Sequence, residues 1–249
     1  MWLKLAKIVG MLLLIVFMIA TLAFTSFEKK EAKCTSIEIS YKADDAIHIS
    51  EDKLLRMVSK ADRKVLSKPL NGINSEIIEQ SVEKLAAIKD AQVYKIIKND
   101  TGTYNGILVI KVKHRKPVLR VISDSGSYYI DKEGFRVPVS TAYTTNVLVA
   151  NGALSEKFAR EKILPFVLYI EKDDFWNAQI EQIYVESDGN VKLVPLVGDH
   201  LIEMGTLDNF ERKLKRVKAF YEQVMSKNNW NKYRQISVKY NNQVIAKKN

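Results

Sequence analysis

The stretch IVGMLLLIVFMIATLAFTSF, residues 8–27, runs for twenty residues without an ionisable side chain. At about 1.5 Å of rise per residue, a helix of this length is roughly 30 Å long, which matches the hydrocarbon core of a bilayer. Lys4 and Lys7 precede the stretch, whereas residues 28–31, EKKE, carry no net charge. The positive-inside rule therefore predicts a cytoplasmic stub at 1–7 and a transmembrane helix at 8–27.

A cleaved signal peptide is the alternative, because Thr21 and Ala23 are small residues of the kind found before a cleavage site. The apolar run is longer than the roughly 7 to 15 residues usual in such a signal, which favours the membrane span. We therefore expect a single-pass protein of the cytoplasmic (inner) membrane. Its N-terminus is then cytoplasmic, and the chain after the span is periplasmic or extracytoplasmic.

The exported part of the chain is basic. After Lys4 and Lys7 are set aside, 37 of the 39 Lys and Arg residues remain against 29 Asp and Glu residues, a formal charge of +8. This charge suits anionic lipid headgroups or an acidic protein partner. Export argues against nucleic acid as the partner. A single cysteine, Cys34, excludes an intramolecular disulfide.

The first exported segment combines strand and helix patterns. Apolar and polar side chains alternate over 35–41, which is typical of a half-buried strand. Two apolar stripes at helical spacing follow, each behind a residue that favours an N-cap. The predicted elements are a strand at 35–41, helices beginning after Ser50 and at Asn74 or Ser75, and strands at 91–97 and 107–113.

Two short motifs follow this segment. HRKPV at 114–118 contains Arg115 and Pro117, and YYIDKEG at 128–134 contains Asp131 and Gly134. Pro117 indicates a strand start or a domain seam, because proline cannot donate to a strand ladder. Asp131 with Gly134 predicts a tight turn between two strands. Taken alone, the second motif favours an ordinary hairpin in an ordinary sheet.

The rest of the chain is rich in strand patterns. The strands over 180–204 are separated by short turns and predict an antiparallel meander. A helix after Ser155 contains Pro165, which must kink or split it. A helix from Asn209 has an apolar seam, and we place its basic residues on the solvated side. Further strands are predicted at 147–150, 235–240 and 243–247; the basic residues are Arg212, Lys213, Lys215, Arg216 and Lys218.

The strand–helix–helix–strand–strand order close outside a membrane span resembles the POTRA module of bacterial envelope proteins. With the two motifs and the terminal Ile236-x-Val238-x-Tyr240 pattern, the chain is similar to the FtsQ/DivIB family of cell-division proteins over nearly its full length. The family commonly has Asp-Leu-Arg-Tyr where this chain has residues 237–240, and glycine where Gln243 stands. The resemblance implies an α+β fold, with a linker at 28–34, a POTRA domain (β-α-α-β-β) at 35–116 and an antiparallel β domain with flanking helices at 117–249.

The resemblance also implies a function. It predicts a non-catalytic bitopic protein of the divisome that recruits and links division proteins at the septum. Its POTRA domain would face other membrane division proteins, and its C-terminal strand would bind FtsB, of the FtsB/FtsL pair, by β-augmentation. The predicted partner-binding residues are Ile236, Val238, Lys239, Tyr240, Gln243, Val244 and Ile245. The alternative is an idle sheet edge guarded by Lys247 and Lys248.

The sequence gives little sign of chemistry. His48, His114 and His200 have no second ligand at metal-binding spacing, and we interpret them as surface or loop residues. Ser50 and Lys53 match the S-x-x-K motif of penicillin-binding proteins, but no S-D-N or K-T-G motif accompanies them. We expect no catalytic residue, cofactor, metal or small-molecule substrate. A wall-modifying enzyme and a POTRA-bearing envelope assembly or transport factor are the alternative functions.

Overall fold

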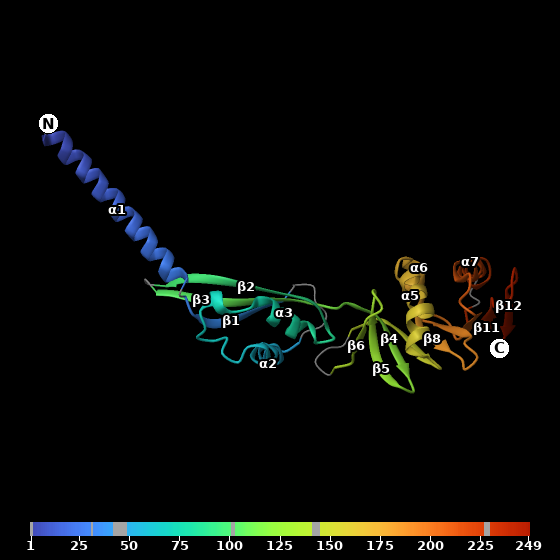
Figure 1. Cartoon of the computed structure of the whole chain (residues 1–249). Helices are drawn as coiled ribbons and strands as arrows, with labels where there is room; N and C mark the ends of the chain where they lie inside the picture. Colours follow the sequence, from blue (N-terminus) through green and yellow to red (C-terminus); the bar gives the residue numbers. More distant parts are fainter. Residues whose placement is uncertain (1, 31, 42–48, 101–102, 141–144, 227–229) are drawn as a thin grey trace. The chain divides into compact units, whose positions relative to one another are not determined.

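The computed structural model of the chain describes residues 2–30, 32–41, 49–100, 103–140, 145–226 and 230–249 (Figure 1). Within the first helix, the described side chains are those of residues 2 and 9–23. The chain divides into two compact units, Met1–His114 and Arg115–Asn249. They are called the N-terminal unit and the C-terminal unit.

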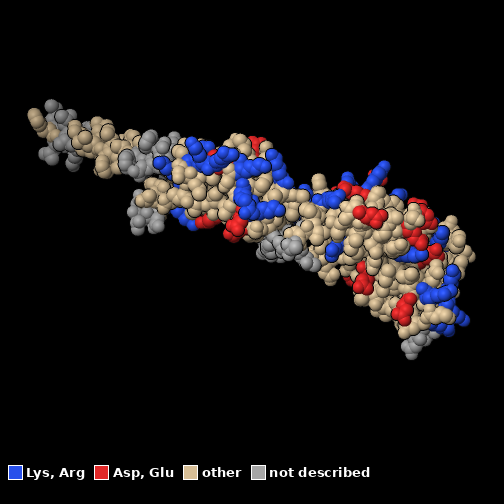
Figure 2. Space-filling view, turned by 90° about the horizontal axis from the view of Figure 1, so that it is seen from below, with Lys and Arg blue, Asp and Glu red and all other residues tan. Residues whose placement is uncertain are grey.

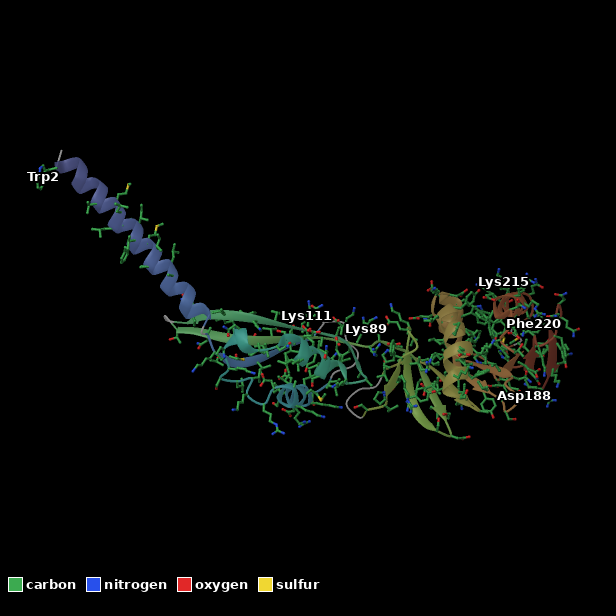
Figure 3. All side chains as sticks on the ribbon, in the orientation of Figure 1. Trp2, Lys89, Lys111, Asp188, Lys215 and Phe220 are labelled. Atoms are coloured by element: carbon green, nitrogen blue, oxygen red, sulfur yellow. The ribbon has the colours of Figure 1, made fainter. Side chains whose placement is uncertain are left out.

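Helix α1 (Trp2–Lys30) begins the N-terminal unit and covers all of the predicted span. Figure 3 shows its described side chains on all sides of the helix. The large apolar side chains between Val9 and Leu22 are each 41–69 % exposed. A search of the described residues identifies no helix with both the length and the hydropathy needed to cross a membrane.

The N-terminal unit also contains a three-stranded sheet in the order β1-β3-β2. The central strand β3 (Thr103–His114) pairs parallel with β1 (Cys34–Tyr41) and antiparallel with β2 (Ile88–Asp100). Helices α2 (Glu51–Ala61) and α3 (Ser75–Glu83) and the short 3-10 turn η1 (Leu70–Gly72) lie between β1 and β2 in the sequence. The order of elements is the one predicted. The core includes Leu54, Val58, Ile78, Val82, Leu108, Ile110 and Val112.

The two helix caps differ. Asn74 Oδ1 accepts a hydrogen bond from the backbone N–H of Ile77, as expected of an N-cap. Ser50 occupies the N-cap position of α2, but its side chain makes no capping hydrogen bond.

Side chains from α3 cover part of the exposed edge of β2. Glu79 Oε1 accepts the backbone N–H of Val93 at 2.7 Å, and Glu83 Oε1 accepts that of Ala91 at 3.2 Å. These carboxylates take the place of a neighbouring strand at two positions of an edge that would otherwise present unpaired backbone groups. Neither carboxylate binds a backbone N–H of β2 beyond Val93.

The prediction that His114 lies on the surface is wrong. Its side chain is 1 % exposed, stacks on Tyr41, and accepts a hydrogen bond at Nε2 from the backbone N–H of Ile49. Alternate side chains of a strand share a face, so His114 continues the inward row of Ile110 and Val112. His48 lies outside the described residues.

The C-terminal unit is built on a nine-stranded sheet in the order β12-β11-β10-β9-β8-β7-β4-β5-β6. The predicted meander is present, because β9 pairs antiparallel with both β8 and β10. The prediction of a purely antiparallel domain is wrong, because β4–β7, β7–β8 and β10–β11 pair in parallel. The strands are β4 (Pro117–Ser123), β5 (Gly126–Asp131), β6 (Arg136–Pro138), β7 (Leu148–Gly152), β8 (Ile180–Val185), β9 (Val191–Pro195), β10 (Leu201–Gly205), β11 (Tyr233–Ser237) and β12 (Ile245–Lys248).

Helical crossovers explain two of the parallel pairs. A strand that returns in the same direction needs a long connection, which is usually helical. Between β7 and β8 lie α4 (Glu156–Phe158), the π-helical turn η2 (Ala159–Ile163), α5 (Leu164–Glu171) and α6 (Asp174–Gln179). Between β10 and β11 lie α7 (Phe210–Phe220) and the π-helical turn η3 (Tyr221–Met225).

Pro165 does not break its helix but follows a change of helix type. Proline has no N–H to donate, and its ring collides with the carbonyl four residues earlier. The π-helical turn η2 directly precedes it, and such turns let a helix absorb an irregular position.

His200 was also predicted at the surface, and the structure places it in the core of the C-terminal unit, 1 % exposed. Its Nε2 lies 2.5 Å from the hydroxyl of Tyr221, and its ring packs edge-on against that of Tyr221. Trp230 packs against both rings. Burial lowers the pKa of His200, and it raises the pKa of Tyr221.

The lowered pKa of His200 predicts acid sensitivity. Below the unfolded pKa of about 6.5 the unfolded chain binds a proton that the folded site resists, so stability falls as the pH drops through that value. We expect the midpoint of thermal unfolding of the C-terminal unit to fall between pH 7 and pH 5. His200→Gln should flatten this decline; an equally steep decline in the variant would show that another group titrates.

Candidate functional site at the C-terminal sheet edge

The last strand, β12, forms one edge of the nine-stranded sheet. It pairs antiparallel with β11, and no other described strand pairs with its second side. The opposite edge strand, β6, has three residues and includes Pro138, which cannot donate to a ladder. Of the two edges, β12 is therefore the one without a proline to limit its pairing.

The predicted partner-binding residues divide into a buried and an exposed group. Ile236 and Val238 are fully buried in the core, so their side chains cannot reach a partner. Strand β11 ends at Ser237, earlier than the predicted 235–240, although the N–H of Val238 still donates to the carbonyl of Glu203.

The exposed group lies in and after the turn that joins β11 to β12. Tyr240 is 54 % exposed and Ile245 is 40 % exposed, and Lys239 and Gln243 are also at the surface. Val244 is partly buried and packs against the core. The structure therefore presents an aromatic and an aliphatic side chain beside an open strand edge.

One arginine of α7 holds this turn. Arg216 NH1 donates to the carbonyls of Tyr240 at 2.8 Å and Gln243 at 3.1 Å, and its NH2 donates to the carbonyl of Val238 at 3.2 Å. Asn242, at a φ of 59°, supplies the left-handed residue of the turn. Because these carbonyls belong to both ends of the turn, Arg216 fixes the conformation in which Tyr240 is displayed.

Lys213 on the same helix was predicted in the solvated set, and that placement is wrong. Its side chain is buried, and its Nζ donates to the carbonyls of Met204 at 3.0 Å and Thr206 at 2.7 Å. Burial lowers the pKa of Lys213. Lys213 thereby ties α7 to the end of β10, the strand that precedes it.

The Arg115–Asp131 motif forms a locked turn at the other end of the unit. Asp131 Oδ1 accepts the N–H groups of Glu133 and Phe135, and Oδ2 accepts from Arg115 NH1 at 2.9 Å. The Arg115 guanidinium lies 4.0 Å from the centre of the Phe135 ring. Gly134 has a φ of 85°, which favours glycine. The motif is structural.

The sequence placed this motif at the seam between domains. Arg115 is the first residue of the C-terminal unit, and Pro117 begins β4.

Asp131→Asn tests the ion pair. The side chains of Asp131 and Arg115 are only 4 % and 14 % exposed. Asparagine would leave the largely desolvated Arg115 guanidinium with the more distant carboxylate of Glu133, at 3.8 Å, in place of the close ion pair. We expect the free energy of unfolding of the C-terminal unit to fall by about 3 kcal/mol. Urea unfolding, monitored by the fluorescence of Trp176 and Trp230, measures this change. Asp124→Asn, at an exposed position of the same unit, is the control and should change it by less than about 0.5 kcal/mol. Equal effects of both variants would contradict the role given to Asp131.

Within the described residues, no group of three or more His, Cys, Asp or Glu side chains could hold a metal ion. The candidate site at β12 therefore consists of backbone groups, exposed apolar side chains and cations.

Comparisons with known proteins agree with this architecture. A family model described as FtsQ/DivIB, C-terminal related, matches residues 116–247, and a POTRA-like domain model matches residues 32–112. No curated protein matches the chain. The first model covers more than half of the 249 residues. The chain therefore belongs to the FtsQ/DivIB family of cell-division proteins, with a POTRA-like domain ahead of the family's C-terminal region.

Proposed function

We propose that the protein is a non-catalytic, single-pass cell-division protein that links other division proteins at the septum by accepting a partner strand at β12. The open edge of β12 beside exposed Tyr240 is the observation that carries this proposal. Family membership supports the role in division, and the absence of catalysis is inferred from the family as well.

Membrane anchoring by residues 8–27 is part of the proposal. Helix α1 is 29 residues long. A helix that is apolar on all sides suits a lipid environment, whereas a helix that packs on a protein surface through one face is amphipathic. Lys4 and Lys7 favour a cytoplasmic N-terminus, which puts both the POTRA-like domain and β12 outside the cytoplasm.

A partner strand would add beside β12. Main-chain hydrogen bonds to an edge strand provide affinity, and neighbouring side chains provide specificity. Tyr240 supplies a rigid amphipathic anchor, and Ile245 supplies apolar surface on the strand itself. Lys239 would attract an acidic residue of the partner. We propose an FtsB-type protein, of the FtsB/FtsL pair of single-span coiled-coil proteins, as the source of this strand.

The alternative is an idle edge. Strand β12 has only four residues, and Lys247 and Lys248 are charges of the kind that guard edges against aggregation. Two observations favour a binding edge. Tyr240 and Ile245 keep apolar surface exposed where a guarded edge needs none, and Arg216 holds the adjoining turn in one conformation.

The POTRA-like domain would contact other membrane-bound division proteins. Its edge strand β2 is covered by Glu79 and Glu83 near its start, so added pairing would use the part beyond Val93. Tyr94 and Ile97 are 45 % and 41 % exposed there. Figure 2 shows Lys and Arg side chains gathered along one side of this unit, whereas the two signs of charge are interspersed on the C-terminal unit.

Tyr240→Ala tests the proposed function. Truncating an aromatic hot spot removes about 2 kcal/mol of binding free energy, so we expect roughly thirtyfold weaker binding of the partner's extracytoplasmic segment to the full chain in a titration. Tyr184→Ala is the matched control, because Tyr184 is a tyrosine of β8 that is 42 % exposed. The control should bind within about twofold of the unaltered chain.

Both variants should remain in the membrane fraction with unchanged unfolding midpoints, which separates binding from folding and anchoring. Unaltered affinity of Tyr240→Ala, or an equal loss in Tyr184→Ala, would place the interface elsewhere.

A further inference from the structure

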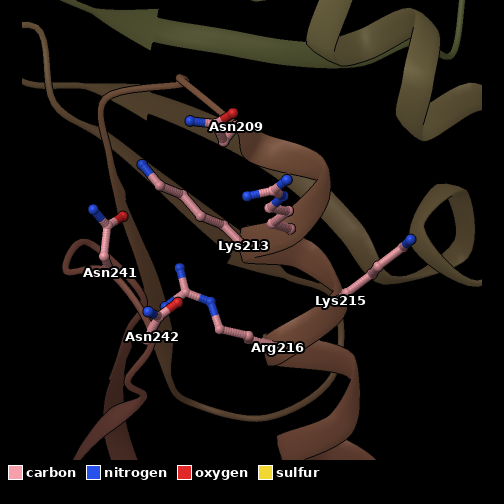
Figure 4. A pocket seen from close by; sticks show the side chains of 7 residues that line it. Asn209, Lys213, Lys215, Arg216, Asn241 and Asn242 are labelled. Carbon is pink, nitrogen blue, oxygen red and sulfur yellow. The ribbon is translucent and has the colours of Figure 1, made fainter.

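A cavity of about 500 Å³ lies between α7 and the turn before β12 (Figure 4). Four basic residues of α7 line it: Arg212, Lys213, Lys215 and Arg216. The other lining residues are asparagines 209, 241 and 242. Every side chain that lines the cavity is therefore a cation or an amide, which is an unusual lining for a cavity of this volume.

The positive charge at this cavity is not neutralised by an ion pair. Lys213 and Arg216 donate to backbone carbonyls, which carry no formal charge. Within the described residues, none of the four basic side chains lies within ion-pair distance of a carboxylate. The charge of Asp208 raises the pKa of Lys213, against the larger effect of burial. The side chain of Asp208 is however 71 % exposed, and its Oδ1 lies 4.0 Å from Lys162 Nζ. The cavity thus concentrates positive charge.

The cations differ in how they are held. Figure 4 shows Lys213 and Arg216 directed toward the loop of Asn241 and Asn242, whereas Lys215 extends in the opposite direction. Arg212 is exposed, and its side chain has no hydrogen bond or ion pair to another described residue. Two fixed cations and one uncommitted guanidinium therefore border the same space. A guanidinium offers a planar pair of donors that matches two oxygens of one anion.

The start of α7 adds to the attraction for an anion. Asn209 is its N-cap residue, at a φ of 53°, and makes no side-chain capping hydrogen bond. The first N–H groups of a helix carry partial positive charge, which favours an anion near that end. Burial and the neighbouring Arg216 also lower the pKa of Lys213, so a bound anion would relieve an unfavourable charge.

We propose that this cavity is a binding site for a phosphate-class oxyanion, with Arg212 as its principal ligand and Lys213 and Arg216 as fixed positive charges. No apolar residue is among the described residues that line the cavity, which argues for a small, highly charged group rather than the side chains of a peptide. The phosphate could be the diester of a lipid headgroup or a terminal phosphate on a soluble molecule. The cavity shares Arg216 and the turn before β12 with the candidate site, but it uses no backbone group of the strand edge and does not rest on the proposed function.

Calorimetric titration of the full chain in a non-ionic detergent with inorganic pyrophosphate, at constant ionic strength, tests this proposal. We expect saturable binding of one pyrophosphate per chain. Arg212→Gln should weaken it at least about tenfold, because it removes the charge-assisted hydrogen bonds of the guanidinium. Lys218→Gln removes an equal charge from the same helix, and Lys218 does not line the cavity, so this variant should bind within about twofold of the unaltered chain.

Two further ligands identify the source of the phosphate. Glycerophosphoglycerol, a diester headgroup, should bind about as well as pyrophosphate if lipid is the source, and at least tenfold more weakly if a terminal phosphate is. The proposal is overturned by three results: no saturable binding of pyrophosphate, equal losses in Arg212→Gln and Lys218→Gln, or binding of a glutamate-rich peptide in place of pyrophosphate. The unfolding midpoint of each variant, followed by tryptophan fluorescence, excludes loss of folding as the cause.

Discussion

The Arg216 guanidinium and the three carbonyls that it binds are the contact on which the C-terminal end of the molecule depends. Strand β11 ends at Ser237 and β12 starts at Ile245, so the chain between them must reverse direction with little secondary structure of its own. A planar fork with several donors can satisfy such a turn from outside, which a lysine ammonium does less well. Through this contact α7 determines where Tyr240 lies and where the edge of β12 begins.

Two basic residues of α7 make structural contacts and do not simply form a solvated face of the helix. Lys213 reaches back to the end of β10, while Arg216 reaches forward to the turn after β11, so α7 joins two parallel neighbours of the sheet by side-chain contacts as well as by the chain. Both cations bind neutral carbonyls, and the charge that they bring remains available to the cavity of Figure 4. A structural role and an anion-binding role are therefore compatible in one helix.

Local patterns in the sequence predicted most helices and strands, but they did not predict which strands pair in parallel or which polar side chains are buried. The N-cap at Asn74, the Asp131–Gly134 turn and the meander over β8, β9 and β10 depend on neighbours in the chain, and they are present. The parallel pairs depend on crossovers, although a strand at 147–150, a helix and a strand at 180–186 were a signal for one of them. Helix α6, which has only six residues, was not predicted, and Asp173 is its N-cap. The buried positions of Lys213, His114 and His200 arise from distant partners that periodicity does not reveal. At the candidate site, the partner-binding residues that the family resemblance implied include Ile236 and Val238, whose side chains the structure buries in the core.

Amide hydrogen exchange of the full chain, with and without the extracytoplasmic segment of the FtsB-type partner at saturation, tests the central claim most directly. A strand added to β12 must use its unpaired backbone groups, so the amides of Ile245–Lys248 should exchange at least about tenfold more slowly in the complex. The amides of Arg136 and Val137, on the opposite edge strand, should not change. Unchanged exchange across Ile245–Lys248 in a saturated complex would contradict strand addition at this edge.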